Sequence, residues 1–161
     1  MPMVSKGNMS FYREHSLGTQ QFQRQEASPE ATILLVEDEN SVRNLMTRFL
    51  TRTNFQVLTA EDGRHAQTVW AAHKAEIDLL LTDVMIPGGL SGRALAEQFQ
   101  AEQPTLKVLY TSGYNAELLN AEGSLSKGSN FVQKPYRPEE LLAGIRAVLA
   151  GQFNSHAETL C

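Results

Sequence analysis

The sequence predicts an α/β domain in which a five-stranded parallel sheet is covered by helices on both faces. Short apolar runs alternate with helix-period segments five times between residues 32 and 150. The apolar runs are continuous, which is typical of strands that are buried on both faces of a parallel sheet. We therefore interpret the chain as five β-α units, (βα)5, that build one doubly wound sheet.

The predicted strands are the short apolar runs Ile33 to Val36, Gln56 to Thr59, Leu79 to Thr82, Lys107 to Tyr110 and Asn130 to Gln133. The predicted helices are the amphipathic stretches Ser41 to Thr51, Gly63 to His73, Ser91 to Ala101, Ala116 to Asn120 and Pro138 to Ala150. Ser41 or Asn40 is expected to cap the first helix, and Pro138 suits the first turn of the last one. Gly123 and Gly128 follow the fourth helix closely, so it is expected to be short.

The chain of 161 residues is 42% hydrophobic, which is enough to bury one core. Residues 1–31 show no sustained period and are interpreted as a mobile polar N-terminal tail. Residues 32–150 form the predicted domain, and residues 151–161 form a polar C-terminal tail. Because this last segment is too short for a DNA-binding or catalytic output domain, we expect output through contact with a target protein.

Composition excludes several classes of protein. The net charge of −4 provides no basic excess, which argues against a nucleic-acid partner. Cys161 is the only cysteine, so no intrachain disulfide or thiolate metal cluster is expected. No apolar run reaches the roughly 18 to 20 residues that span a bilayer, and no apolar signal segment begins the chain. We expect a cytoplasmic protein with no membrane partner.

Polar residues that carry chemistry follow the predicted strands. Glu37 and Asp38 follow the first strand, Asp83 the third, Ser112 the fourth and Lys134 the fifth. In an open parallel sheet, ligands bind beyond the carboxyl ends of the strands. If the central strands are neighbours, these side chains converge at one edge of the sheet.

Each of these residues alone also has a purely structural explanation. Asp38 precedes a helix, Asp83 opens a Pro-Gly turn, and Lys134 could be a solvated lysine. The combination is more informative, because crowded carboxylates repel one another unless a cation lies among them. Oxygen ligands without His or Cys favour a hard ion, so we expect Mg²⁺.

The predicted magnesium ligands are Asp38, Glu37 acting through water, Asp83 and the backbone carbonyl of Met85. A magnesium ion, an exposed aspartate, a hydroxyl and a lysine together match the needs of phosphoryl transfer. Asp83 is the expected nucleophile.

The four motifs that end the strands resemble the signature motifs of response-regulator receiver domains of bacterial two-component systems and phosphorelays. They are Ile33-Leu-Leu-Val-Glu-Asp-Glu39, Leu79-Leu-Leu-Thr-Asp-Val-Met-Ile-Pro-Gly-Gly89, Val108-Leu-Tyr-Thr-Ser-Gly-Tyr114 and Phe131-Val-Gln-Lys-Pro-Tyr136. The resemblance covers residues 32–150 and implies strand order 2-1-3-4-5. It also implies phosphorylation by a histidine kinase or a histidine phosphotransfer protein, and it leaves open a homodimer. The domain would then be a signalling phosphoprotein rather than an enzyme.

The resemblance assigns roles by position. Glu37 and Asp38 correspond to the acidic pair, and Asp83 corresponds to the phosphoacceptor. Lys134 corresponds to the lysine that pairs with the phosphoryl group, and the peptide bond that follows it is expected to be cis. Ser112 corresponds to the switch hydroxyl.

Phe131 corresponds to the aromatic switch residue of the family. Two features depart from the commonest pattern. Gly92 lies one place later than usual, as in receivers attached to hybrid histidine kinases. Thr111 and Ser112 are adjacent hydroxyls, and Ser112 is preferred because the small Gly113 follows it.

Alternative functions were weighed on the same residues. A phosphorylation-independent docking module would retain the fold without the chemistry. An aspartate-nucleophile phosphohydrolase ordinarily has Asp-x-Asp after the first strand, whereas here Asn40 stands two places after Asp38. A dinucleotide-binding domain would need a Gly-rich turn in place of Glu-Asp-Glu-Asn.

Overall fold

The computed structural model describes residues 28–113 and 130–152. Its strands are β1 (Thr32–Val36), β2 (Gln56–Ala60), β3 (Leu79–Asp83), β4 (Lys107–Ser112) and β5 (Phe131–Gln133). Its helices are α1 (Asn40–Arg52), α2 (Gly63–His73), α3 (Gly92–Glu102) and α5 (Pro138–Leu149). The predicted fourth helix, Ala116 to Asn120, lies outside the described residues, as do nearly all residues of the two predicted tails.

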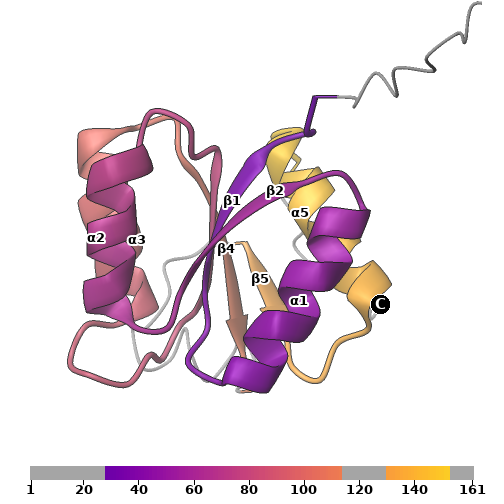
Figure 1. Ribbon diagram of the computed structural model, residues 1–161, viewed down its shortest axis with the longest axis horizontal. Helices are drawn as coiled ribbons and strands as arrows, with labels where there is room; N and C mark the ends of the chain where they lie inside the picture. Colours follow the sequence, from indigo (N-terminus) through magenta and orange to yellow (C-terminus); the bar gives the residue numbers. More distant parts are fainter. Residues whose placement is uncertain (1–27, 114–129, 153–161) are drawn as a thin grey trace, which may run out of the picture.

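All five strands are parallel and lie in the order β2-β1-β3-β4-β5. Helices α1 and α5 cover one face of the sheet, and α2 and α3 cover the other (Figure 1). Right-handed crossovers explain this division, since the chain runs one way from β1 to β2 and the opposite way thereafter. The α/β fold class and the strand order that the family resemblance implies are both confirmed.

Two hydrophobic cores sandwich the sheet, because successive side chains of a strand point to opposite faces. In β1, Ile33 belongs to the core beneath α1 and α5, whereas the next residue, Leu34, belongs to the core beneath α2 and α3. Trp70 stacks on Phe99 in the second core, with ring centroids 4.4 Å apart. Burial on both faces explains why the strands have continuous apolar sequences.

The beginning of α1 differs from the sequence-based expectation. The residue before the helix is Glu39, whose side chain makes no capping hydrogen bond. Asn40 and Ser41 already lie inside the helix, so neither can cap it, and the Ser41 hydroxyl instead donates to Oε1 of Glu39. The described helices include none that has both the length and the apolar character needed to cross a bilayer.

Candidate functional site

The register of the sheet brings the ends of β1 and β3 together. Val36 pairs with Thr82 in the sheet. The next residues, Glu37 after β1 and Asp83 at the end of β3, therefore lie side by side. The chain reverses its direction of travel across the sheet between β1 and β3, and ligands bind at such a switch point in open α/β sheets. The acidic residues therefore lie at the position that the topology favours for binding.

Lys134 connects the two carboxylates. Its side-chain nitrogen lies 3.2 Å from Oε2 of Glu37 and 3.1 Å from Oδ2 of Asp83. The pairing spans 97 residues to Glu37 and 51 residues to Asp83. The backbone places the lysine, because its amide donates to the carbonyl of Ser112 at 2.7 Å. Three strand ends thus share one ion-pair cluster.

Glu37 is the most buried charged residue of this cluster, with 4% of its surface exposed. Its amide continues the sheet by donating to the carbonyl of Ala60, and its Oε1 accepts a hydrogen bond from the amide of Glu39. A buried carboxylate requires such partners, because an uncompensated charge in the interior is costly.

Asp83 lies at the surface end of β3, with 18% of its side chain exposed. Its Oδ1 accepts a hydrogen bond from the amide of Met85 at 3.2 Å, while Oδ2 faces Lys134. The first residue of α3, Gly92, packs so closely that a side chain there would overlap the Asp83 carbonyl. The carboxylate is therefore partly accessible and held on two sides.

The charge of Lys134 is stabilised by this arrangement. Burial by itself lowers the pKa of the lysine, since it disfavours the charged form. The hydrogen bond that Lys134 donates to Asp83 and the negative charges of Asp83 and Glu37 act in the opposite direction and raise the pKa of the lysine above its ordinary value. The lysine is accordingly a fixed positive charge at neutral pH.

The two adjacent hydroxyl residues of β4 are both buried. Thr111 is 3% exposed and pairs with Asp83 in the sheet, and Ser112 is 1% exposed and pairs with Gln133. Phe131 begins β5, where it is half-buried against the core beneath α2 and α3. The peptide bond between Lys134 and Pro135 is cis, as the family resemblance implies.

The carboxylate oxygens of Glu37 and Asp83 are of the kind that a magnesium ion prefers as ligands. Both residues already direct an oxygen toward one cation, the ammonium group of Lys134. Met85 lies with its backbone against Asp83 and is itself exposed. The Asp38 side chain is exposed, and the ion pairs of Lys134 go to Glu37 and Asp83. Within the described ranges, no three acidic, His or Cys side chains form a preassembled metal cage.

Sequence reasoning missed one residue of this edge. Arg43, in the first turn of α1, donates to the carbonyls of both Glu37 and Asp38. The available indication was its position in the first turn of the helix that follows the acidic residues.

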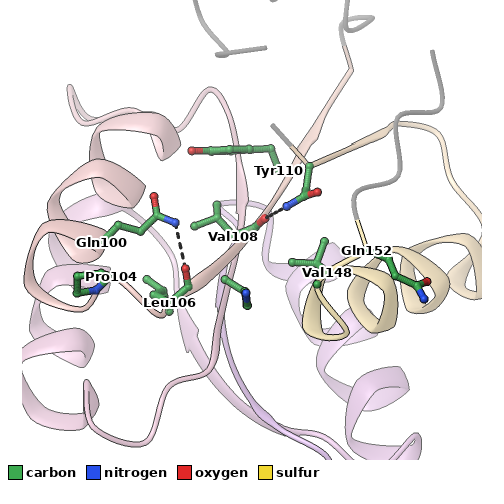
Figure 2. A pocket seen from close by; sticks show the side chains of 10 residues that line it. Gln100, Pro104, Leu106, Val108, Tyr110, Val148 and Gln152 are labelled. Carbon is green, nitrogen blue, oxygen red and sulfur yellow. Dashed lines mark hydrogen bonds between the residues drawn. The ribbon is translucent and has the colours of Figure 1, made fainter. Parts of the chain in front are cut away.

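A separate hollow of about 280 Å³ lies among α3, β4 and the end of α5 (Figure 2). Two side-chain amides close its walls: Gln100 donates to the carbonyl of Leu106, and Asn130 donates to that of Val108. Its lining includes none of Glu37, Asp38, Asp83 and Lys134, so it does not belong to this site.

Comparison with known proteins identifies the family of this chain. The family model described as "Response regulator receiver domain" matches residues 33–146. The solved receiver domain from the hybrid histidine kinase CckA is 31% identical, with a TM-score of 0.62, covering 74% of this chain and 99% of that one. The chemotaxis protein CheY4 of Vibrio cholerae is 26% identical, with a TM-score of 0.64, covering 73% and 98%.

Curated relatives include an uncharacterized transcriptional regulatory protein, YrkP, of Bacillus subtilis, which is 32% identical over 117 residues, covering 73% of this chain and 48% of YrkP. Protein PetR of Rhodobacter capsulatus is 32% identical over 118 residues, with coverage of 73% and 48%. The chain spans about half the length of these two relatives. It belongs to the response regulator receiver domains, the signalling domains of two-component systems.

Proposed function

We propose that this receiver domain accepts a phosphoryl group on Asp83, from a phosphohistidine of a histidine kinase or phosphotransfer protein, and signals through contact with a target protein. The observation that carries the proposal is the position of Lys134, whose ammonium group contacts both Asp83 and the buried Glu37. A partly accessible carboxylate beside a fixed cation suits a nucleophile that must receive a negatively charged group.

In the proposed reaction, an Asp83 carboxylate oxygen attacks phosphorus while the bond between phosphorus and the histidine nitrogen breaks. The imidazole, which carries a proton on its other ring nitrogen, leaves with the electron pair of that bond as the neutral histidine side chain, and the product is an aspartyl phosphate. Lys134 keeps its proton and turns from the Asp83 carboxylate toward the phosphoryl oxygens, where it balances their charge.

Glu37, Asp38, Asp83 and the Met85 carbonyl would hold the magnesium ion. When bound, the ion supplies charge neutralisation between the carboxylate and the incoming phosphoryl group. Glu37 is fixed by its own hydrogen bonds, whereas Asp38 is free to adjust because its side chain is exposed. The proposed site therefore combines one rigid and one adaptable carboxylate.

Ser112 and Phe131 form the proposed switch. The Ser112 hydroxyl would hydrogen-bond to the phosphoryl group, and Phe131, half-buried next to β4, would turn into the space that the serine vacates. Moving a population from 1:99 to 99:1 requires about 5.5 kcal/mol. Two charge-assisted hydrogen bonds, from Ser112 and Lys134, at roughly 1.5–3 kcal/mol each nearly supply that difference.

The proposal is tested by intact-mass spectrometry after incubation with acetyl phosphate and Mg²⁺. Wild type is expected to gain one phosphoryl group, and a chelator is expected to prevent the gain. Asp83→Asn should gain none. Asp62→Asn is the matched control, because the Asp62 side chain caps α2 by accepting a hydrogen bond from the amide of His65, and asparagine caps equally well. If the wild-type protein binds Mg²⁺ but never gains the phosphoryl group, it is a phosphorylation-independent docking module instead.

A further inference from the structure

The turn that carries the acidic pair has little support from its own sequence. Residues 37–39 connect β1 to α1, and the helix that follows has no side-chain cap at its beginning. Glu37 is anchored by the sheet and by Lys134, but the exposed Asp38 depends on its backbone for its position. Something other than a capping residue must therefore hold this turn in place.

Arg43 supplies that support from the first turn of α1. Its Nη1 donates to the carbonyl oxygen of Glu37 at 2.6 Å and to that of Asp38 at 3.3 Å. Its Nη2 donates to Oδ1 of Asn40 at 3.0 Å. One planar guanidinium thus fixes the carbonyls of both acidic residues and the residue that begins the helix.

Arg43 is itself held firmly. Its backbone amide donates to the carbonyl of Glu39, and its carbonyl accepts a hydrogen bond from the hydroxyl of Thr47 at 2.7 Å. The side chain is half-buried. The helix anchors the arginine, and the arginine anchors the turn. The positions of Glu37 and Asp38 therefore depend on the position of α1.

The choice of partners matters for metal binding. An arginine beside three acidic residues could form a salt bridge, yet in the described part of the chain Arg43 donates only to two carbonyls and an amide oxygen. The carboxylate oxygens of Asp38 therefore stay available to a metal ion. We propose that Arg43 is a positioning residue, which orients Glu37 and Asp38 for Mg²⁺ through their main-chain carbonyls; this inference rests on the magnesium site of the proposed function.

A role of Arg43 through its charge and a role in positioning the turn predict opposite effects on Mg²⁺ binding when the arginine is removed. If Arg43 acted only through its positive charge, Arg43→Met would strengthen Mg²⁺ binding, because a cation near the site repels the metal. If Arg43 positions the turn, the same substitution weakens Mg²⁺ binding by about tenfold, the lower end of the effects seen for groups that orient metal ligands. Arg43→Lys keeps the charge and can restore only part of the hydrogen bonding, so its affinity should be intermediate.

The test is an Mg²⁺ titration of the full chain, in which binding is measured from the NMR shifts of the backbone amides of residues 37–39. Arg48→Met serves as the control, since it removes an exposed arginine from the same helix, and it should leave the Mg²⁺ dissociation constant unchanged. Urea unfolding of every variant establishes that the protein remains folded during the titration.

An unchanged or smaller dissociation constant in Arg43→Met would overturn the positioning role, and so would a wild-type chain that binds no Mg²⁺. The outcome is separate from that of phosphorylation. A wild type that gains a phosphoryl group while Arg43→Met binds Mg²⁺ normally refutes only this inference. Weakened Mg²⁺ binding in Arg43→Met, together with no phosphoryl gain by wild type, refutes only the proposed function.

Discussion

The side-chain nitrogen of Lys134 lies 3.1 Å from Oδ2 of Asp83, although Lys134 follows β5 and Asp83 ends β3, and these strands are not neighbours. Strand β4 lies between them, and the lysine backbone is joined to it through the carbonyl of Ser112. The same lysine reaches the buried Glu37 beyond β1. One cation therefore balances two carboxylates at the edge where the sheet topology favours a ligand.

Replacing Lys134 by methionine should destabilise the fold. Glu37, whose side chain is 5% exposed, would lose its ionic partner, and its charge would face that of Asp83. We expect the free energy of unfolding to fall by about 2–3 kcal/mol, since a buried charge without a partner is costly. Urea denaturation measures the loss, and Lys107→Met is the control because Lys107 is exposed. A loss no greater than that of the control would contradict the structural role of the lysine.

The contribution of Lys134 should disappear at high pH. Its pKa is raised above the ordinary value of 10.5, so the folded state keeps the proton longer than the unfolded state does. Stability then falls as pH rises through this window, because the folded state binds more protons. The difference in unfolding free energy between wild type and Lys134→Met should be constant below 10.5 and shrink above it.

Denaturant unfolding at a series of pH values checks this prediction. Burial raises the pKa of Tyr110 to about 12, so ionisation of this tyrosine also destabilises the fold at high pH. It is present in both proteins, so its effect cancels in the difference. A difference that stays constant as pH rises above 10.5 would contradict the stabilising role of the Lys134 ion pairs.

Gly92→Ala should disturb Asp83 directly. The added Cβ would overlap the carbonyl oxygen of Asp83 and lie 2.8 Å from Oγ1 of Thr82. We expect a loss of about 1–3 kcal/mol in unfolding free energy, as for other overpacked sites, together with slower phosphoryl uptake. Gly113→Ala is the control, since its Cβ would meet nothing within 4 Å. Equal stability of the two variants would contradict the close packing of α3 on β3.

Ser112→Ala should separate phosphorylation from its structural response. Asp83 remains in place, so the variant should still gain a phosphoryl group from acetyl phosphate. Without the hydroxyl, the NMR shift changes that phosphorylation causes at Phe131 should be lost. Thr111→Val is the matched substitution of the neighbouring buried hydroxyl and should retain them. The reverse result would assign the switch to Thr111.

The alternation of apolar runs and amphipathic segments predicted every described strand and helix, with boundaries correct to within two residues. The largest difference is the end of β4, which was expected at Tyr110 and lies at Ser112. Polar residues after an apolar run indicated a loop, yet Thr111 and Ser112 are buried and pair with β5. Side-chain polarity alone cannot distinguish a loop from a buried strand end.

The site could be predicted less completely. The motifs indicated Glu37, Asp83 and Lys134, and the structure brings these three together. Their direct pairing depends on the register of the sheet, which local sequence does not determine. Arg43 was not predicted for a related reason. Its hydrogen bonds go to main-chain carbonyls, which every residue has, so the residue types in the sequence do not indicate them.

The most direct test of the account identifies the residue that carries the phosphoryl group. The protein is phosphorylated with acetyl phosphate and Mg²⁺, reduced with borohydride and digested for peptide mass mapping. Hydride displaces phosphate from an aspartyl phosphate and converts that aspartate to homoserine. The account predicts homoserine at position 83 and nowhere else. Homoserine at Asp38 or another aspartate, with Asp83 intact, would contradict it.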